Sequence, residues 1–433
     1  MSWRDYNTGS MIRMRAFFFV FIGGGGFLIP FLNLYYSRAG MSGAQIGLLS
    51  MLAALSALLA APVWGQWSDR SRQVGRLLLA SLLAAAAAAL VLGAQRSFPG
   101  FALATSLHSL LSAGSIPLST TLAMLAIAAA GRGGFGEIRR WGSLGWAVFV
   151  LAAGPLLETW GLGLIFPAYA LAFVISALLL PRTPARPPSV GEVGMEVNRP
   201  TQAPAQEIHK TSHTDGAPLP AFTPPRPSLL SINLKLPSAV RLLFFNPALR
   251  VLFAALLISG VLNAGWRQFW QIYMDQLGAT ESLIAVGAML GAAVEMPAML
   301  YVDRWNRRFG PRRVLLASLG LDAARLSIVL LAPRPLTILL VNAVGGVAFS
   351  LVTIGLVAYV LEHTPEYHKT TMLAVFTVTL ANLILIVGGP LTGAAFDALG
   401  AYWLYALGAA GSFLGWAVLY WGTRTQNGLP AAR

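Results

Sequence analysis

The stretch that decides the fold reads Gly65-Gln66-Trp67-Ser68-Asp69-Arg70 and continues, after a short gap, with Gly75-Arg76. It lies between two long apolar runs. A related stretch appears in the second part of the chain, where Asp303-Arg304 is followed by Gly310-Pro311-Arg312-Arg313. This self-similarity predicts an internal repeat.

A second pair of matching segments strengthens this prediction. Gly154-Pro155-Leu156-Leu157-Glu158 occurs in the first part, and Gly389-Pro390-Leu391, with Asp397 a little later, occurs in the second. Each is followed by a glycine and then by the final apolar run of its part. Two matches in the same order are improbable by chance, so we predict two similar halves.

The composition indicates a membrane protein. Of the 433 residues, 56% are hydrophobic and 11% are charged, and the mean hydropathy is +0.66, whereas soluble chains carry about 25% charged residues. The net charge of +14 resides in short loops between apolar runs, which disfavours nucleic-acid binding. Cysteine is absent, and this excludes disulfides, thiol catalysis and cysteine-ligated metals.

The apolar runs predict an all-α integral membrane fold, because a spanning helix needs about 20 mostly apolar residues and only helices or closed barrels satisfy their backbone in lipid. The spans are expected near 14–37, 44–67, 76–95, 99–127, 138–157, 162–181, 247–274, 281–303, 313–333, 336–361, 371–395 and 399–421. This gives about twelve transmembrane helices.

Loop charge predicts the orientation. One set of loops holds most of the arginines, while the alternate set holds only Arg38, Arg96 and Arg334. The positive-inside rule places the arginine-rich loops, and with them both termini, in the cytoplasm. We therefore expect a multi-pass protein of the inner (plasma) membrane.

Residues 182–245 break the pattern, because they are rich in proline and contain no apolar run long enough to span. We expect a largely disordered cytoplasmic linker here, between an N-terminal bundle at 1–181 and a C-terminal bundle at 246–433. Within it, 227–245 is expected to lie on the membrane surface.

The Gly65 to Arg76 stretch resembles the loop signature of the major facilitator superfamily. The resemblance implies two pseudo-symmetric six-helix bundles with the substrate site between them near the membrane midplane. It also implies a conformational latch that holds the outward-open state, formed by Gly65, Asp69, Arg70, Gly75, Arg76, Asp303 and Arg304. In such a latch a carboxylate accepts hydrogen bonds from a helix N-terminus or an arginine, and glycine permits close helix approach. The alternative is an ordinary topology loop.

Residues 135–146, FGEIRRWGSLGW, resemble the start of the fifth helix in galactoside/proton symporters and in related phenylpropionate-type and nucleoside permeases. In the galactoside group, the arginine that matches Arg139 binds sugar hydroxyls and the tryptophan that matches Trp146 stacks on the sugar ring. The alternative is that Arg139 only anchors the helix end in the cytoplasm.

Glu295, Asp322 and Arg325 fall inside predicted spans, where a charge is costly unless it is paired or hydrated. Glu295 lies in the eighth span, and Asp322 and Arg325 share a face of the ninth. By resemblance, an arginine at the place of Arg325 serves proton coupling in the galactoside symporters. We expect Glu295 to take up a proton or contact substrate, and Arg325 to hold a carboxylate in one state and release it in another. The alternative is a static Asp322–Arg325 ion pair.

The seventh span carries Asn263, Trp266, Trp270 and Tyr273 on one helical face. Such a face is usually an interfacial belt; the alternative for Trp266 and Trp270 is substrate stacking or an outer gate. Arg267 is expected toward the outer side. The chain lacks the galactoside group's His-x-x-Glu pair and its acid in span four, so lactose-like specificity is not expected.

Together these features predict a secondary transporter of a small organic solute, in the sugar, nucleoside or aromatic-acid class, coupled to protons as a symporter. Proton-coupled efflux is the alternative within transport. A membrane enzyme or receptor is disfavoured, because no clustered nucleophile, base or metal site is evident, and no phosphate-binding loop indicates a nucleotide-driven pump. We expect no cofactor, and a functional monomer, because one chain contains both halves of the site.

Overall fold

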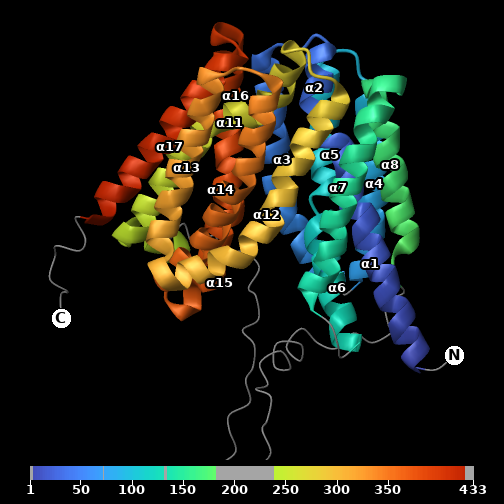
Figure 1. Cartoon of the computed structure of the whole chain (residues 1–433). Coiled ribbons are helices and arrows are strands. Elements are labelled where there is room, and N and C mark those ends of the chain that lie inside the picture. Colours follow the sequence, from blue (N-terminus) through green and yellow to red (C-terminus); the bar gives the residue numbers. More distant parts are fainter. Residues whose placement is uncertain (1–2, 72, 131–133, 182–237, 425–433) are drawn as a thin grey trace, which may run out of the picture.

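The computed structural model describes residues 3–71, 73–130, 134–181 and 238–424 (Figure 1). Within these ranges all regular structure is helical, and 12 helical segments are long and apolar enough to cross a membrane. Their bounds lie within a few residues of the predicted spans, so the predicted fold class is confirmed.

The long helices run roughly along one direction (Figure 1). The first six spans comprise α1 (Trp3–Leu28) with α2 (Leu32–Arg38), α3 (Gly43–Ser71), α4 (Val74–Gly93), α5 (Phe98–Ser112) with α6 (Ser115–Ala130), α7 (Phe135–Trp160), and η1 (Leu162–Leu164) with α8 (Ile165–Leu179). The last six comprise α11 (Pro247–Gln276), α12 (Glu281–Phe309), α13 (Pro311–Leu331), α14 (Pro335–Glu362), η2 (Glu366–His368) with α15 (Lys369–Ala374), η3 (Val375–Thr379) and α16 (Leu380–Leu399), and α17 (Ala401–Arg424).

Helix boundaries follow local sequence signals. The side chain of Asn246 accepts hydrogen bonds from the backbone of Ala248 (3.0 Å) and Leu249 (3.3 Å) and so caps α11, with Pro247 in the first position, where its missing N–H costs nothing. Gly310 adopts a φ of +80° between α12 and α13, a conformation that other residues rarely adopt. These signals place α11, α12 and α13 accurately.

The linker prediction is only partly covered by the described residues. Its range 182–237 lies outside them. Residues 238–245 form the short helix α10 (Ser238–Phe245), which leads directly into α11. Phe244 and Phe245 of this helix are exposed, whereas Leu243 packs into the apolar cluster around α11. The expected position of this segment on the membrane surface stays a prediction.

The first six and last six spans meet where α3 packs against α16 and α7 packs against α12. At both contacts the matching Gly-Pro-Leu segments of the sequence supply the glycine. A Cβ on Gly154 would lie 2.6 Å from the Cα of Ser282, and one on Gly389 would lie 2.6 Å from the carbonyl oxygen of Gly47. The helices approach this closely because no side chain intervenes.

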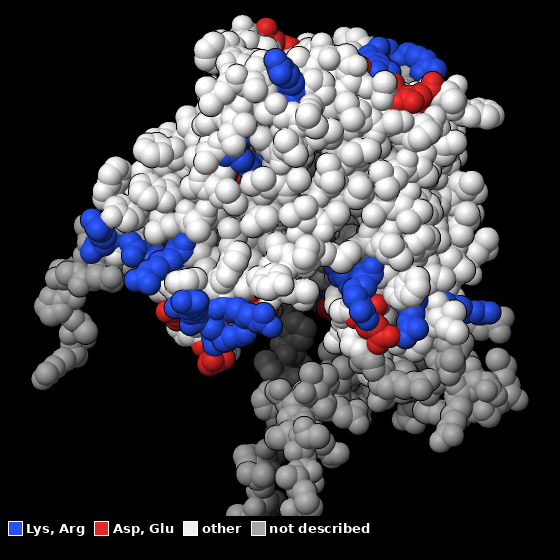
Figure 2. Space-filling view, viewed as in Figure 1, with Lys and Arg blue, Asp and Glu red and all other residues white. Residues whose placement is uncertain are grey.

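We call the end of the bundle that carries α2 the upper end and the opposite end the lower end (Figure 1). Arginine and lysine gather mainly at the lower end, and few charged residues lie on the flank between the two ends (Figure 2). This distribution matches a protein whose middle zone faces lipid.

Candidate functional site

A cavity of about 420 Å³ lies where the two sets of spans meet. Its volume falls in the range of about 300–1,000 Å³ that is typical of small-molecule sites. Its polar and aromatic lining consists of Asn33, Trp146, Trp266, Arg267, Trp270, Gln271, Glu295, Asp322, Arg325, Asn342 and Phe349.

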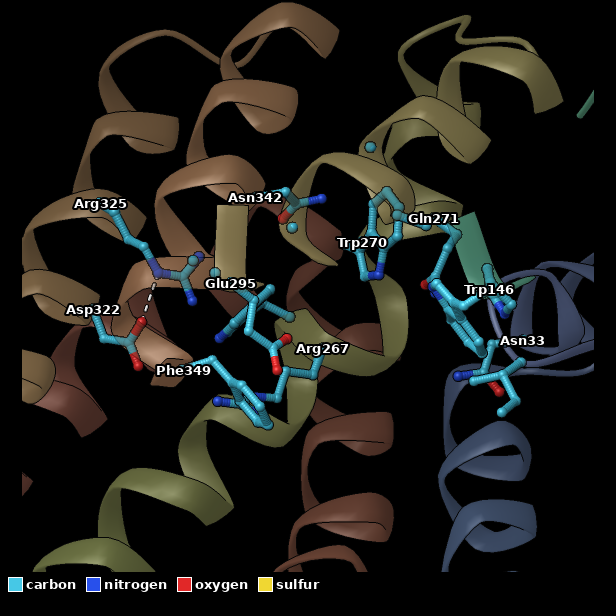
Figure 3. Close-up of a pocket in the computed structure, with 18 residues that line it drawn as sticks. Asn33, Trp146, Arg267, Trp270, Gln271, Glu295, Asp322, Arg325, Asn342 and Phe349 are labelled. Atoms are coloured by element: carbon cyan, nitrogen blue, oxygen red, sulfur yellow. Dashed lines mark hydrogen bonds and ion pairs between the residues drawn. The ribbon is translucent and has the colours of Figure 1, made fainter. Parts of the chain in front are cut away.

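The two halves contribute unequally to this wall. All four ionisable residues, Arg267, Glu295, Asp322 and Arg325, come from α11, α12 and α13. From the first half, the turn between α1 and α2 supplies only apolar side chains, α2 supplies one amide and α7 supplies one indole. The charged residues lie toward one end of the cavity, and Trp146, Gln271 and Asn33 lie toward the other (Figure 3).

Asp322 and Arg325 form a buried ion pair. The Nε of Arg325 donates to an oxygen of Asp322 at 2.6 Å (Figure 3). Its Nη1 donates to the carbonyl oxygen of Val341 at 3.3 Å. Arg325 is only 2% exposed. Gly345 of α14 makes the space for it, because a Cβ there would lie 3.1 Å from Nη1.

Trp266 supports this arginine from the other side. The guanidinium of Arg325 lies 4.5 Å from the ring centroid of Trp266, a cation–π contact that strengthens when water is excluded. The indole N–H donates to Asn263 at 2.6 Å, and the Asn263 amide donates to the hydroxyl of Ser412 at 2.8 Å. This chain of contacts, from α17 through α11 to α13, fixes the guanidinium.

Glu295 is held differently, because its carboxyl makes no hydrogen bond or ion pair with any described residue. Its backbone carbonyl accepts a hydrogen bond from the Ser350 hydroxyl at 3.1 Å. The main chain at Glu295 is therefore held in place, while no bonded partner among the described residues holds the carboxyl. The cation whose field reaches this carboxyl is Arg139, across the junction with α7.

Arg267 also lines the cavity, and its position toward the outer side of the membrane stays a prediction. The residue is exposed and borders the cavity. The guanidinium lies 5.5 Å from the ring of Trp266. Two arginines therefore flank one indole, and only Arg325 has a carboxylate bound directly to it.

The structure thus brings together most of the residues expected from sequence. Trp146, Trp266, Trp270, Glu295, Asp322 and Arg325 all line one cavity. Arg139 does not line it; it is exposed near the start of α7 and acts on Glu295 through its charge alone. Asn33, Gln271 and Asn342 were not predicted from the sequence. A neutral amide in an apolar run costs much less to place in the membrane than a charged group, so it does not stand out as a candidate.

The latch residues are not engaged with each other in this conformation. Asp69 and Asp303 are exposed, and neither makes an ion pair within the part of the chain that the structure describes. Arg76 donates to Gln73 at 3.0 Å, within its own half. A Cβ on Gly65 would have no neighbour within 4 Å, so the close approach expected at this glycine is absent here.

The upper end is closed by polar contacts between the halves. Arg38 donates to Asp275 and to Glu281, each at 2.6 Å. The carboxylate of Asp397 accepts hydrogen bonds from the backbone N–H of Gly43 (2.6 Å) and Ala44 (2.8 Å) at the start of α3.

A matching contact joins α7 to α12, where Glu158 accepts from the backbone N–H of Ser282 at 2.9 Å. We call the five residues Arg38, Glu158, Asp275, Glu281 and Asp397 the upper seal. Glu158 and Asp397 belong to the segments whose repetition marked the two halves in sequence, and this repetition was the available signal for them.

Comparison with known proteins settles the family. Residues 11–407 match the sequence profile described as the MFS_1 like family. The chain belongs to the MFS_1 like family. This MFS_1 like protein is 28% identical over 362 residues to the maltose permease of Geobacillus stearothermophilus, covering 83% of this chain and 81% of the permease. It is 26% identical over 404 residues to a putative sugar efflux transporter of Deinococcus radiodurans, covering 91% and 93% of the two chains.

Solved structures show the same fold. The nucleoside transporter NupG superposes with a TM-score of 0.76 at 14% identity, covering 96% of the MFS_1 like chain and 98% of NupG. A bacterial homolog of the human lysosomal transporter Spinster, in an inward-facing conformation, superposes with a TM-score of 0.67 at 15% identity, covering 99% of each chain. The MFS_1 like protein is a multi-pass membrane transporter of small solutes, and these relatives are transporters rather than enzymes.

Proposed function

We propose that this chain is a proton-coupled secondary transporter of saccharides that works by alternating access. The observation that carries the proposal is the environment of Glu295. It is an ionisable group without a bonded partner among the described residues, and it lines a solute-sized cavity at the junction of the two halves.

The lining supports a hydroxylated ring as the solute. Indole faces pack well against the apolar faces of sugar rings, and amide side chains both donate and accept hydrogen bonds with hydroxyl groups. Trp146 and Trp270 supply indoles from opposite halves, while Asn33 and Gln271 supply amides from opposite halves. Relatives that align over most of the chain are named maltose permease and putative sugar efflux transporter.

Proton coupling follows from the cost of charge in the membrane. An ionised carboxyl at the centre of a bilayer costs about 2–3 kcal/mol or more unless it is paired or hydrated. When the cavity closes around solute and loses water, Glu295 must therefore be protonated or find a cation. Its titration would then be tied to the conformational cycle, because each state offers the carboxyl different neighbours.

The positive-inside rule orients this cycle. The lower end, which holds most of the arginines (Figure 2), would face the cytoplasm. The sealed upper end would face outward, so the conformation described here would be the inward-facing one. The latch would form when the lower end closes.

The test uses purified protein in proteoliposomes with a pH indicator in the external medium. Addition of maltose, or of another saccharide from a panel, to the native protein should alkalinise the external medium. Glu295→Gln should abolish proton movement, while Glu362→Gln, at an exposed acid near the lower end of α14, should leave it intact. Solute movement by the native protein without any proton signal would contradict the coupling.

Direction needs a second measurement, because one of the relatives is named for efflux. Uptake and efflux by the same proton-coupled site differ in whether solute and proton move together or exchange. An inward proton gradient should concentrate solute inside vesicles if they move together. Accelerated loss of preloaded solute under the same gradient would indicate exchange.

A further inference from the structure

The charge of Arg267 is not balanced inside the cavity. Among the residues that the structure describes, none makes a hydrogen bond or an ion pair with its guanidinium; its only direct partner is the ring of Trp266. Arginines inside membrane proteins are costly and mark functional sites by default. The absence of a partner in a wall otherwise rich in polar groups requires an explanation.

The neighbouring charges do not supply the missing balance. Arg267 interacts electrostatically with Asp322, which attracts it, and with Arg325, which repels it. Because Asp322 and Arg325 are bound to each other at 2.6 Å, these two effects oppose one another. The charge of Arg267 is therefore only partly offset, and no carboxylate is bonded to its guanidinium among the described residues.

Glu295 does not neutralise Arg267 either. Although both line the same cavity (Figure 3), the cation that acts on Glu295 is Arg139. The space between Glu295 and Arg267 belongs to the cavity, so a solute placed there would contact both groups. The planar fork of an arginine matches a carboxylate, which it binds through two parallel hydrogen bonds.

We infer that Arg267 binds a carboxylate of the transported solute, and that the solute is an acidic saccharide such as a uronate or an aldonate. This rests on the proposed function and narrows its substrate class. The indoles and amides would bind the hydroxylated part of the solute, and Arg267 would select its charge.

The charge count of the wall supports the pairing of this anion with a proton. The charge that acts on Glu295 is Arg139 on α7. Among the described residues, the other ionisable groups of the cavity wall are Arg267 on α11 and Asp322 with Arg325 on α13, while α14 contributes only neutral groups. With a proton on Glu295, the lining carries two arginines against one aspartate. A monoanionic solute makes this sum zero, so proton and solute would favour each other's binding.

The experiment compares matched acidic and neutral saccharides, with D-glucuronate against D-glucose and maltobionate against maltose. Binding is measured by calorimetry in detergent, and counterflow of the labelled compounds is measured in proteoliposomes. The native protein should bind the acid of each pair more tightly. Arg267→Gln should weaken binding of the acid by about 10- to 100-fold, the usual worth of a charged hydrogen bond, and should leave the neutral partner within about twofold.

Two variants keep the result interpretable. Arg267→Lys retains the charge without the planar fork and should retain part of the preference for acids. Arg250→Gln removes an exposed arginine at the lower end of the same helix and should change neither ligand. The unfolding temperature of each variant shows whether it is folded.

The outcomes separate this inference from the proposed function. Counterflow of neutral saccharides with no preference for the acids would overturn the inference and leave the transport of saccharides standing. An equal loss of acidic and neutral binding in folded Arg267→Gln would also overturn it, because Arg267 would then only shape the wall. Failure of folded native protein to bind or move any member of the panel would overturn the proposed function and the inference with it.

Discussion

At the scale of single residues, the contacts of Arg325 show how a membrane interior holds a charge. A carboxylate, a backbone carbonyl and an indole face surround its guanidinium, and a glycine on α14 leaves room for it. The Asp322 carboxylate has a wider effect, since it also attracts Arg267. Asp322 therefore stabilises two cations that flank one indole.

Loss of this carboxylate should destabilise the protein. Asp322→Asn leaves Arg325 and Arg267 on either side of Trp266 without a carboxylate between them, and breaking a buried pair typically costs about 3–5 kcal/mol. The double variant Asp322→Asn with Arg325→Gln should recover most of this loss, because the unpaired charge is also removed. Thermal unfolding in detergent measures both; a double variant as unstable as the single one would show that the ion pair is not the cause.

Sequence reasoning identified the residues whose placement in lipid is costly. Glu295, Asp322 and Arg325 stood out because each interrupts an apolar run, and all three line the cavity. Arg267 interrupts a run too, but its aromatic neighbours resembled an interfacial belt, and depth in the membrane cannot be read from one helix alone. The direction in which a neutral amide such as Asn33 points depends on packing between helices, which the sequence did not reveal.

At the scale of helices, the upper seal depends on helix ends. Asp397, near the end of α16, accepts from the first N–H groups of α3, and Glu158, near the end of α7, accepts from Ser282 at the start of α12. Free N–H groups and the helix dipole both favour a carboxylate at such a place. The same device thus closes the two junctions between the halves.

Removal of these two charges should open the upper end. Each of Glu158→Gln and Asp397→Asn should shift the equilibrium by about 1 kcal/mol, or ~5-fold, the usual worth of a helix cap. Because the native chain has no cysteine, spin labels can be placed at Ala94→Cys and Gln276→Cys alone. Double electron–electron resonance should show a larger population with long distances between the two labels when Glu158→Gln and Asp397→Asn are combined.

The matched control for this experiment is Glu362→Gln, which removes a carboxylate at the other end of the molecule and should leave the distances unchanged. Identical distance distributions in the native and seal-deficient proteins would rule out a role for the carboxylates in closure.

The span boundaries needed for such label placement could be predicted from hydropathy alone. The interruption of the first span at Pro30 and the π-helical turn Val375–Thr379 were not predicted, because they depend on local backbone geometry within apolar runs.

At the scale of the whole molecule, the distribution of charge sets the orientation. Arginines gather at the lower end (Figure 2). The last turns of α12 carry the exposed Arg304, Arg307 and Arg308. The alternate loops at the upper end contain few cations, and one of these, Arg38, is bound to two carboxylates. The protein should therefore insert with the lower end in the cytoplasm.

Single cysteines test this orientation directly. In intact cells, a membrane-impermeant maleimide should label Gln276→Cys almost completely, because this residue is exposed at the upper end. Arg307→Cys should be labelled only after the membrane is permeabilised, with the cysteine-free native chain as the background. The reverse pattern would invert the assigned orientation, and the conformation described here would then be open to the outside.

The unequal wall of the cavity has a consequence for how such a protein diversifies. The two halves carry matching segments in the sequence, yet only the second supplies the ionisable side chains that line the cavity. Mutations in α2, in the turn before it and in α7 can therefore reshape the cavity around a new molecule without removing the charges opposite. In such a protein, substrate specificity would change through the first half, while the second half would retain the charged residues that couple transport to protons.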